Sequence, residues 1–336
     1  MDAPDAPDAP GAPAAPGFAA ALAAGPLVLD GGLSEQLAAG GYDLTGALWS
    51  ARLLADAPEA VRAAHRAYFA AGARVAITAS YQASFAGFAR RGIGRAGAAR
   101  LLARSVELAR EAARGLPGPR RWVAASVGPY GAVLADGSEY RGRYGLTAAE
   151  LEAFHRPRLE VLAAAGPDVL ALETVPDVEE ARVLLRAVRG LGVPAWLSFG
   201  AAGGLTRAGQ PLAEAFALAA EVDEVVAVGV NCCTPEDADR AVGLAARVSG
   251  KPVVVYPNSG EGWDTANGAW CGEPTFSADR VAGWLADGAR LVGGCCRVGP
   301  PGIRAVAAEV ATAVAAEVAA EVTTRAAPTR AAGRPD

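Results

Sequence analysis

The sequence predicts a single (β/α)8 barrel, or TIM barrel, of the α/β class, and two observations support this. Eight short apolar runs rich in β-branched residues alternate with longer segments whose hydrophobic residues recur with helical periodicity. The unusual polar and sulfur-containing residues of these runs fall at the carboxyl ends, which converge on one catalytic face in a barrel. They are Asp30, Ser80, Glu173, Asn231, Cys232, Asn258, Cys295 and Cys296. An open, doubly wound parallel sheet is the alternative, and this placement favours the barrel.

Taken in order, the expected strands are short runs separated by turn residues and helical segments. They span residues 26–32, 73–80, 121–129, 167–174, 194–200, 225–232, 252–259 and 289–296. The connection 81–120 is long enough to carry additional helices. Residues 130–145, with the sequence YGAVLADGSEYRGRYG, are polar and rich in Gly and Tyr, and we expect a loop that covers the active site rather than a helix.

The two ends of the chain differ in composition from the rest. Residues 1–17 form an Ala/Pro-rich segment, and residues 321–336 contain TTRAAPTRAAGRPD. Such segments bury too little apolar surface to fold, so both are expected to be disordered tails. The barrel domain is therefore predicted to span residues 18–320, with a final helix after the last strand closing it.

Composition restricts the class of protein. The chain has 336 residues, 52% of them hydrophobic, and a formal net charge of −5. This charge leaves no basic patch for nucleic acid, and no apolar run approaches the roughly 18 residues that span a bilayer. Five cysteines without an export signal indicate reduced thiols. We expect a soluble, cytoplasmic protein that acts on small molecules as a monomer or small homo-oligomer.

Scarce residue types exclude other chemistries. Lys251 is the only lysine and precedes its strand, so a Schiff-base lysine at the carboxyl end of that strand is unavailable. The only histidines, His65 and His155, lie in helical segments and are expected on a helix surface or in packing. Two histidines are too few for a His-rich hydrolytic metal site. A catalytic metal would therefore be held by sulfur.

Three cysteines are placed where they could meet. Cys232 ends the sixth expected strand, and Cys295 and Cys296 follow the eighth, where Gly293 and Gly294 could provide a bend. Three thiols with one open position are typical of a catalytic zinc site. Buried free cysteines and a redox-active vicinal pair are the alternatives. We expect Cys233 to face away from Cys232 and pack in the core, and the sequence indicates no role for Cys271.

Several motifs in the same order resemble the homocysteine S-methyltransferase family, most closely its bacterial enzymes that use S-methylmethionine. They are DGGLSEQL, LWSARLL, ITASYQASFAGF, SVGPYGAVLADGSEYRG, FHRPRLEVL, LALETVPD, GVNCC, VVYPNSGEGWD and RLVGGCCR, and they cover nearly the whole chain between the tails. One departure is DGGLSEQL, where close relatives often have DGAMATEL. The departure keeps the acidic residue.

The resemblance implies a zinc-dependent enzyme of methionine biosynthesis that methylates the thiol of L-homocysteine. It implies one zinc ion per chain, with Cys232, Cys295 and Cys296 as ligands. It also implies that Asp30 and Glu173 hold the substrate amine and that the Gly31 and Gly32 backbone lies close to the substrate.

Each of these polar residues also has a purely structural interpretation. Asp30 could be a turn former, and Glu173 could be a carboxylate satisfied at a helix N-terminus. Asn231 could contact the substrate, support Cys232 or form a loop hydrogen bond, and the sequence does not separate these roles.

The expected methyl donor is S-methyl-L-methionine, with S-adenosylmethionine used less well. This choice depends on the resemblance and on aromatic residues that could face a sulfonium, namely Tyr130, Tyr140 and Trp263. Asp136, Glu139 or Glu261 could meet the ammonium of the donor. Betaine- and folate-dependent methylation are the competing reactions, and a non-catalytic zinc- or thiol-binding protein is the competing class.

Overall fold

The computed structural model describes residues 17–44, 48–264 and 269–326. Nearly all of the N-terminal tail expected at residues 1–17, and residues 327–336 of the C-terminal tail, lie outside these ranges. None of the helices within the ranges combines the length and apolar character needed to cross a bilayer.

All eight expected strands are present and form a parallel barrel. Their order around the barrel is β1, β11, β8, β7, β5, β4, β3, β2. A bridge between Leu29 and Val75 joins β1 to β2 and completes the ring, which excludes the open sheet. The strands are β1 (Leu27–Val28), β2 (Val75–Ile77), β3 (Trp122–Val127), β4 (Val169–Val175), β5 (Ala195–Ala202), β7 (Val225–Asn231), β8 (Val253–Tyr256) and β11 (Ala289–Val292).

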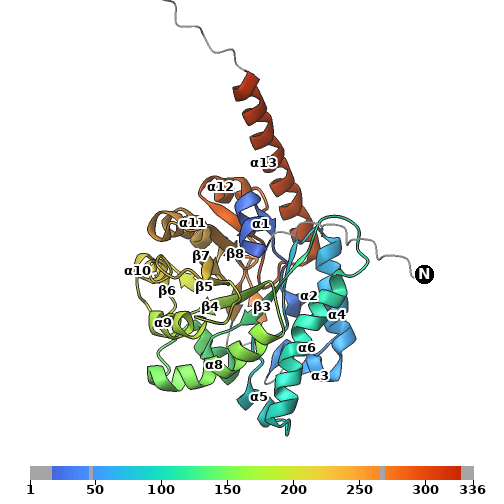
Figure 1. The fold of residues 1–336 in the computed structure, drawn as a ribbon, viewed down its shortest axis with the longest axis vertical. Coiled ribbons are helices and arrows are strands. Elements are labelled where there is room, and N and C mark those ends of the chain that lie inside the picture. Colours follow the sequence, from blue (N-terminus) through green and yellow to red (C-terminus); the bar gives the residue numbers. More distant parts are fainter. Residues whose placement is uncertain (1–16, 45–47, 265–268, 327–336) are drawn as a thin grey trace, which may run out of the picture.

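Helices surround the barrel, as Figure 1 shows. They are α2 (Leu33–Ala39), α4 (Pro58–Ala70), α6 (Arg95–Ala113), α8 (Ala148–Ala164), α9 (Val178–Ala187), α10 (Leu212–Ala217), α11 (Pro235–Ser249), α12 (Arg280–Ala286) and α13 (Pro300–Ala326). Of these, α4, α6, α9 and α11 are amphipathic and place their apolar sides against the strands, as the periodicity predicts.

The connections contain further short elements. They are α1 (Phe18–Ala24), η1 (Trp49–Arg52), α3 (Leu53–Asp56) and α5 (Phe85–Ala89). Small hairpins are made by β6 (Leu205–Thr206) with β5 and by β9 (Gly262–Asp264) with β10 (Ala269–Cys271).

The barrel interior is a separate apolar core filled by large side chains. Trp122, Trp196 and Tyr256 are fully buried there. Phe18 of α1 packs against both tryptophans, with ring centroids 5.5 Å from Trp122 and 6.5 Å from Trp196. Both tryptophans lie near the amino ends of their strands. Helix α1 therefore packs against the amino-terminal end of the barrel, opposite the end that carries the unusual residues.

The structure differs from the sequence predictions in two segments. The stretch 130–145 is not a loop without helices, because it contains α7 (Tyr130–Leu134) and the 3-10 turn η2 (Ser138–Tyr140). Helix α13 continues to Ala326, past the boundary expected at residue 320, because no Gly or Pro interrupts this part of the sequence. Figure 1 shows α13 extending away from the barrel.

Candidate metal and substrate site

The three predicted thiols come together at the carboxyl end of the barrel. The Sγ atoms of Cys232, Cys295 and Cys296 all lie within 4.8 Å of one another. The sulfurs of Cys232 and Cys295 are in contact, with Cα atoms 5.7 Å apart, and Cys296 keeps a free thiol. In the ranges that the structure describes, these residues are the cluster of metal-ligand types that could hold an ion.

Backbone geometry explains how neighbouring cysteines take different roles. Cys232 has a φ of 47°, a left-handed conformation that turns the chain where β7 ends. Cys233 is fully buried in the layer between strands and helices, and burial raises its thiol pKa to about 12. It therefore stays protonated and packs in the core, as the sequence predicts. Cys271 is exposed on β10.

Cys295 and Cys296 can share one task because β11 has already ended at Val292. Gly293 and Gly294 act through their small size, since neither has a positive φ. A Cβ on Gly293 would lie 2.7 Å from the Cβ of Leu29, and one on Gly294 would lie 2.3 Å from Val298. The two glycines therefore allow close packing, whereas the sequence predicts that they provide a bend.

The backbone of the cysteine loop is fixed by hydrogen bonds to the end of β8. The Cys295 N–H donates to the Pro257 carbonyl at 2.7 Å, and the Cys296 N–H donates to Asn258 Oδ1 at 3.2 Å. The Ser259 N–H donates to the Cys296 carbonyl at 3.0 Å. These bonds fix the position of the two cysteines relative to the carboxyl end of β8.

The three sulfurs fit a metal ion that prefers thiolates. In a tetrahedral zinc site with Zn–S bonds of about 2.3 Å, the sulfurs are about 3.8 Å apart. The separation of less than 4.8 Å is compatible with this geometry. Binding would require the Cys232–Cys295 contact to open. Metal binding and sulfur–sulfur pairing are therefore alternative states of the same thiols.

Asp30 follows β1 and is buried, with one oxygen unused. Its Oδ2 accepts a hydrogen bond from the Ile77 N–H at 2.9 Å, and its Oδ1 has no partner. His65 Nδ1 lies 4.0 Å from Oδ2, but burial lowers the pKa of His65 to about 4, so this ring is neutral at pH 7. Burial also raises the Asp30 pKa well above its usual range. A turn-forming role does not account for these contacts, which cross to β2.

Glu173 lies within β4 and accepts hydrogen bonds from two other strands. Ser126 Oγ donates to Oε1, and Tyr256 OH donates to Oε2 at 2.9 Å. Burial raises its pKa to about 7, although both hydrogen bonds oppose that shift. The helix N-terminal interpretation is therefore wrong. Ser126 and Tyr256 are not among the site residues that the sequence predicts, and their only signal is their position in the SVGP and VVYP strand ends.

Asn231 supports the neighbourhood of Glu173 through the backbone. Its Oδ1 accepts from the Thr174 N–H and from Ser198 Oγ, both at 2.8 Å, and its Nδ2 donates to Thr174 Oγ1 at 2.7 Å. Thr174 has a φ of 58°, so its conformation needs such support. These contacts favour a supporting role, and direct contact between Asn231 and substrate stays a prediction.

Gly31 and Gly32 let the loop after β11 lie directly on the end of β1. A Cβ on Gly31 would lie 2.1 Å from the Val298 carbonyl oxygen, and one on Gly32 would lie 2.8 Å from the Cys295 oxygen. The Gly32 N–H donates to the Val298 carbonyl at 3.0 Å. The structure thus gives these glycines a role within the protein, beside the substrate contact that stays a prediction.

The three aromatic residues expected at the donor differ in position. Tyr140 lies near the cysteine cluster, because Arg207 has its Cζ 5.3 Å from the Tyr140 ring centroid and donates to the Cys232 carbonyl at 3.3 Å. The ring of Tyr130 instead packs on Tyr144 and Phe154, at 5.3 and 5.0 Å. The Trp263 backbone belongs to β9, and its side chain lies outside the described part of the chain. Tyr140 is the strongest of the three candidates.

The three acidic candidates also differ. Asp136 is exposed and lies 3.8 Å from Arg141. Glu261 accepts hydrogen bonds from Arg297 Nε at 2.7 Å and from Ser259 Oγ at 2.8 Å. Glu139 is only 3% exposed and its Oε2 has no partner.

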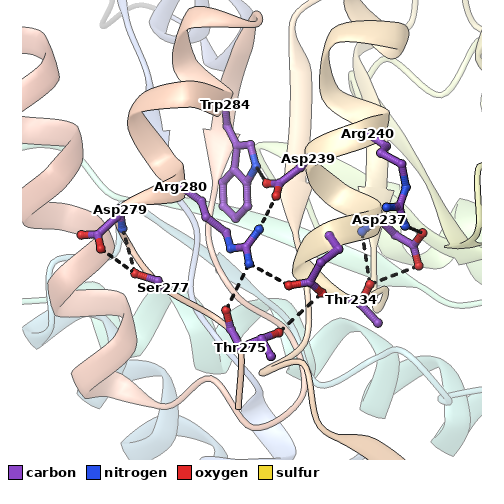
Figure 2. A network of polar contacts seen from close by, with 10 residues as sticks. Thr234, Asp237, Asp239, Arg240, Thr275, Ser277, Asp279, Arg280 and Trp284 are labelled. Carbon is purple, nitrogen blue, oxygen red and sulfur yellow. Dashed lines mark hydrogen bonds and ion pairs between the residues drawn. The ribbon is translucent and has the colours of Figure 1, made fainter. Parts of the chain in front are cut away.

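A polar network between α11 and α12 supports the segment that holds Cys296. Figure 2 shows Arg280 of α12 reaching Asp239 of α11, to which Trp284 also donates at 2.7 Å. Arg280 donates to Glu236 of α11 as well, at 2.7 Å. Thr275 also contacts this network, and its N–H donates to the Ser259 carbonyl at 2.8 Å. Because Ser259 binds the Cys296 carbonyl, the outer helices help to position the cysteine loop.

The remaining scarce residues are structural, as expected. His65 and His155 are fully buried in α4 and α8, and His155 hydrogen-bonds Glu180 at 2.8 Å. Lys251 donates to the carbonyls of Val222 and Val225 at 2.9 and 2.7 Å, before β8 begins. It therefore lies at the end of the barrel opposite the cysteines.

The fold and the site together define a barrel protein with three thiols, arranged so that they could hold a metal ion, at the carboxyl ends of its strands. A family model described as homocysteine S-methyltransferase matches residues 27–310. The chain is 44% identical to homocysteine S-methyltransferase 4 of Zea mays, covering 86% of this chain and 90% of that protein. It is also 44% identical to YbgG of Bacillus subtilis, covering 84% and 93%. The chain belongs to the homocysteine S-methyltransferase family, which confirms the resemblance in its motifs.

Solved structures agree with this assignment. The metallated form of the Escherichia coli homocysteine methyltransferase MmuM matches with a TM-score of 0.75 and 43% identity, covering 84% of this chain and 95% of that one. The oxidized form of the same enzyme also matches with a TM-score of 0.75. The barrel fold is therefore shared with a methyltransferase that has been observed with metal and in an oxidized state.

Proposed function

We propose that this protein transfers a methyl group from a sulfonium donor to the thiol of L-homocysteine, producing methionine. The donor is S-methyl-L-methionine, and S-adenosylmethionine is used less well. Zinc is the metal, held by Cys232, Cys295 and Cys296. The observation that carries the proposal is the cluster of three thiols beside a buried carboxylate residue, since the Gly294 N–H, next to Cys295, donates to the Asp30 carbonyl at 3.3 Å.

The residues of the chain account for the binding of homocysteine. Asp30 and Glu173 are buried acidic groups whose charges act on one another, so one ammonium group can neutralise both. The unpartnered Oδ1 of Asp30 is available to accept from it. The amino-acid end of homocysteine would therefore lie between β1 and β4, with its thiol directed to the cysteines.

The chemistry requires a thiolate but no acid or base. Zinc bound to three thiolates lowers the pKa of a fourth, incoming thiol and keeps its sulfur nucleophilic. The homocysteine sulfur forms a bond to the methyl carbon as the bond from that carbon to the donor sulfur breaks. The electron pair of the broken bond leaves on a neutral thioether that needs no proton. This agrees with a site whose nearby histidine, His65, is neutral and buried.

The test is methionine formation from homocysteine by the zinc-loaded protein, run in parallel with S-methylmethionine, S-adenosylmethionine and betaine. We expect S-methylmethionine to support the fastest turnover at equal concentration. Turnover with betaine at least as fast would overturn the donor assignment. Full activity after complete removal of metal by a chelator would overturn the role of zinc.

A second function is favoured by one observation, the contact between the sulfurs of Cys232 and Cys295. A thiol-based redox protein would use this pairing without methyl transfer. For such a redox protein, the metal-free form that arises in air should be the active one. A methyltransferase should instead be inactive in that form until reductant and zinc are both restored. Methionine formation that depends on zinc and is blocked by oxidation would exclude the redox protein.

A further inference from the structure

Two buried carboxylate oxygens within the described ranges have no hydrogen-bond partner, Asp30 Oδ1 and Glu139 Oε2. A buried charged oxygen without a partner is unfavourable, so such atoms point to a missing ligand. The proposed reaction has two amino-acid substrates, and each carries an ammonium group. Asp30 and Glu173 provide for one of them. The second ammonium group needs another anion, and Glu139 is the remaining carboxylate of this kind.

Glu139 is buried in the segment that follows β3. It lies in η2, and its N–H is 2.5 Å from the point that a Cβ on Gly131 would occupy, so η2 packs directly on α7. The adjacent Tyr140 has its ring centroid 5.3 Å from Cζ of Arg207, and Nη2 of Arg207 donates to the Cys232 carbonyl at 3.3 Å. The carboxylate is therefore near the thiols but belongs to a different element from Asp30 and Glu173.

Arg207, whose guanidinium could bind the carboxylate of an amino acid, lies close to Tyr140. Arg207 follows β6 and donates from Nη2 to the Cys232 carbonyl at 3.3 Å. Its Cζ lies 5.3 Å from the centroid of the Tyr140 ring, and its Nε is buried without a partner. A guanidinium binds a carboxylate through two parallel hydrogen bonds. Arg207 thus has donors left for a carboxylate near Tyr140.

We propose that Glu139 and Arg207 bind the amino-acid end of the methyl donor, Glu139 its ammonium and Arg207 its carboxylate. Tyr140 lies next to both and offers a ring face to the sulfonium. This inference rests on the proposed function and adds the residues that select the donor. It explains why a sulfonium amino acid would be preferred over a small methylated cation.

The experiment compares S-methylmethionine with two sulfonium compounds from which its charged groups are removed in steps. S-Methylmethionine has both ends, dimethylsulfoniopropionate has a carboxylate without an ammonium, and trimethylsulfonium has neither. The two truncated compounds are measured as competitive inhibitors against S-methylmethionine, so they need not react. The variants are Glu139→Gln, Glu139→Asp and Arg207→Gln. Glu152→Gln and Arg156→Gln, on the exposed face of α8, are matched controls.

Glu139→Gln should raise the KM for S-methylmethionine at least about tenfold, the loss expected for a shielded charged hydrogen bond. Its inhibition constants for both truncated compounds and its KM for homocysteine should stay within about twofold. Glu139→Asp should give a smaller increase. Arg207→Gln should weaken S-methylmethionine and dimethylsulfoniopropionate alike and leave trimethylsulfonium unchanged. Zinc content and melting temperature should match the native protein.

Other outcomes overturn the inference. If Glu139→Gln behaves like Glu152→Gln, or weakens trimethylsulfonium as much as S-methylmethionine, Glu139 does not bind the donor ammonium. If its KM for homocysteine rises instead, Glu139 serves the acceptor. A variant that loses zinc or stability would show a structural role. Failure of the native protein to use S-methylmethionine would instead refute the proposed function, so the two failures are distinguishable.

Discussion

Polar side chains at the carboxyl end of the barrel differ in how completely the protein satisfies their hydrogen-bonding groups. Asn231 is committed to Thr174 and Ser198, whereas Asp30 and Glu139 each keep a buried oxygen without a partner. A satisfied buried group stabilises the fold, and an unsatisfied one is costly until a ligand arrives. This contrast is the basis on which we propose ligand binding for Asp30 and Glu139 and a supporting role for Asn231.

Replacing the clustered thiols should remove metal and activity together. Cys232→Ser, Cys295→Ser and Cys296→Ser each delete one soft ligand, so zinc content should fall well below one ion per chain and methyl transfer should be abolished. Cys233→Ala is the matched control, because Cys233 is buried in the apolar layer and should leave zinc bound. Metal content by mass spectrometry and methionine formation are the measurements. Equal losses in all four variants would contradict the ligand assignment.

Glu173→Gln should weaken homocysteine binding more than zinc binding. The substitution keeps the size of the side chain and removes the charge that pairs with ammonium, worth about 1.5–3 kcal/mol for a charged hydrogen bond. The KM for homocysteine should therefore rise by about tenfold or more at unchanged zinc content. If simple thiols without an amino group served the native protein as well as homocysteine does, this role for Glu173 would be wrong.

The raised pKa of Glu173 predicts an acid limb in the pH profile. With a pKa of about 7, Glu173 holds a proton below that value and becomes the ammonium-binding carboxylate above it. The kcat/KM for homocysteine should therefore fall as pH decreases below about 7, because this ratio reports groups of the free enzyme. In Glu173→Gln this limb should be lost or displaced. An unchanged limb in the variant would assign it to another group.

At the scale of elements, the site depends on how two loops pack. The loop after β11 carries Cys295 and Cys296 and rests on the segment Asp30–Gly32 after β1. Ser259 and Thr275, together with the α11–α12 network in Figure 2, also support this loop through hydrogen bonds. The cysteines are thus positioned by backbone contacts between elements that are distant in sequence.

Gly31→Ala should destabilise the protein and disturb the metal site. The added Cβ would lie 2.1 Å from the Val298 carbonyl oxygen, so the cysteine loop must move, at a cost of about 1–3 kcal/mol. Gly283→Ala is the control, because Gly283 lies within α12 with no atom within 4 Å of the added Cβ, and alanine favours a helix there. Melting temperature and zinc content should fall only in the first variant. Retention of both would contradict the packing argument.

At the scale of the whole molecule, the barrel could be predicted because buried parallel strands have continuous apolar sequences. The three clustered thiols could be predicted because strand ends meet on one face. The partners of Glu173 could not, since Ser126 and Tyr256 reach it only through the register of different strands. The helices α7 and η2 were missed because each is too short to show periodicity.

The far end of α13 should be dispensable for stability. Ile303, Val306 and Val310 are buried against the barrel, whereas Val318 is 56% exposed. A chain that stops at residue 317 should keep its melting temperature and activity. One that stops at residue 302 should unfold readily, because each lost buried aliphatic side chain contributes about 1.5–3 kcal/mol. Thermal denaturation of the two truncated chains tests this, and equal stability would show that α13 contributes nothing to the barrel.

The contact between the loops after β1 and β11 joins the beginning of the barrel to its end. Gly32 N–H binds the Val298 carbonyl, and Gly294 N–H binds the Asp30 carbonyl at 3.3 Å. During synthesis the N-terminal strands emerge first. Two of the three thiols, and the surface on which Asp30 rests, are then still inside the ribosome. The proposed metal site therefore forms only when the ring of strands is complete, so metal uptake would distinguish finished molecules from interrupted ones.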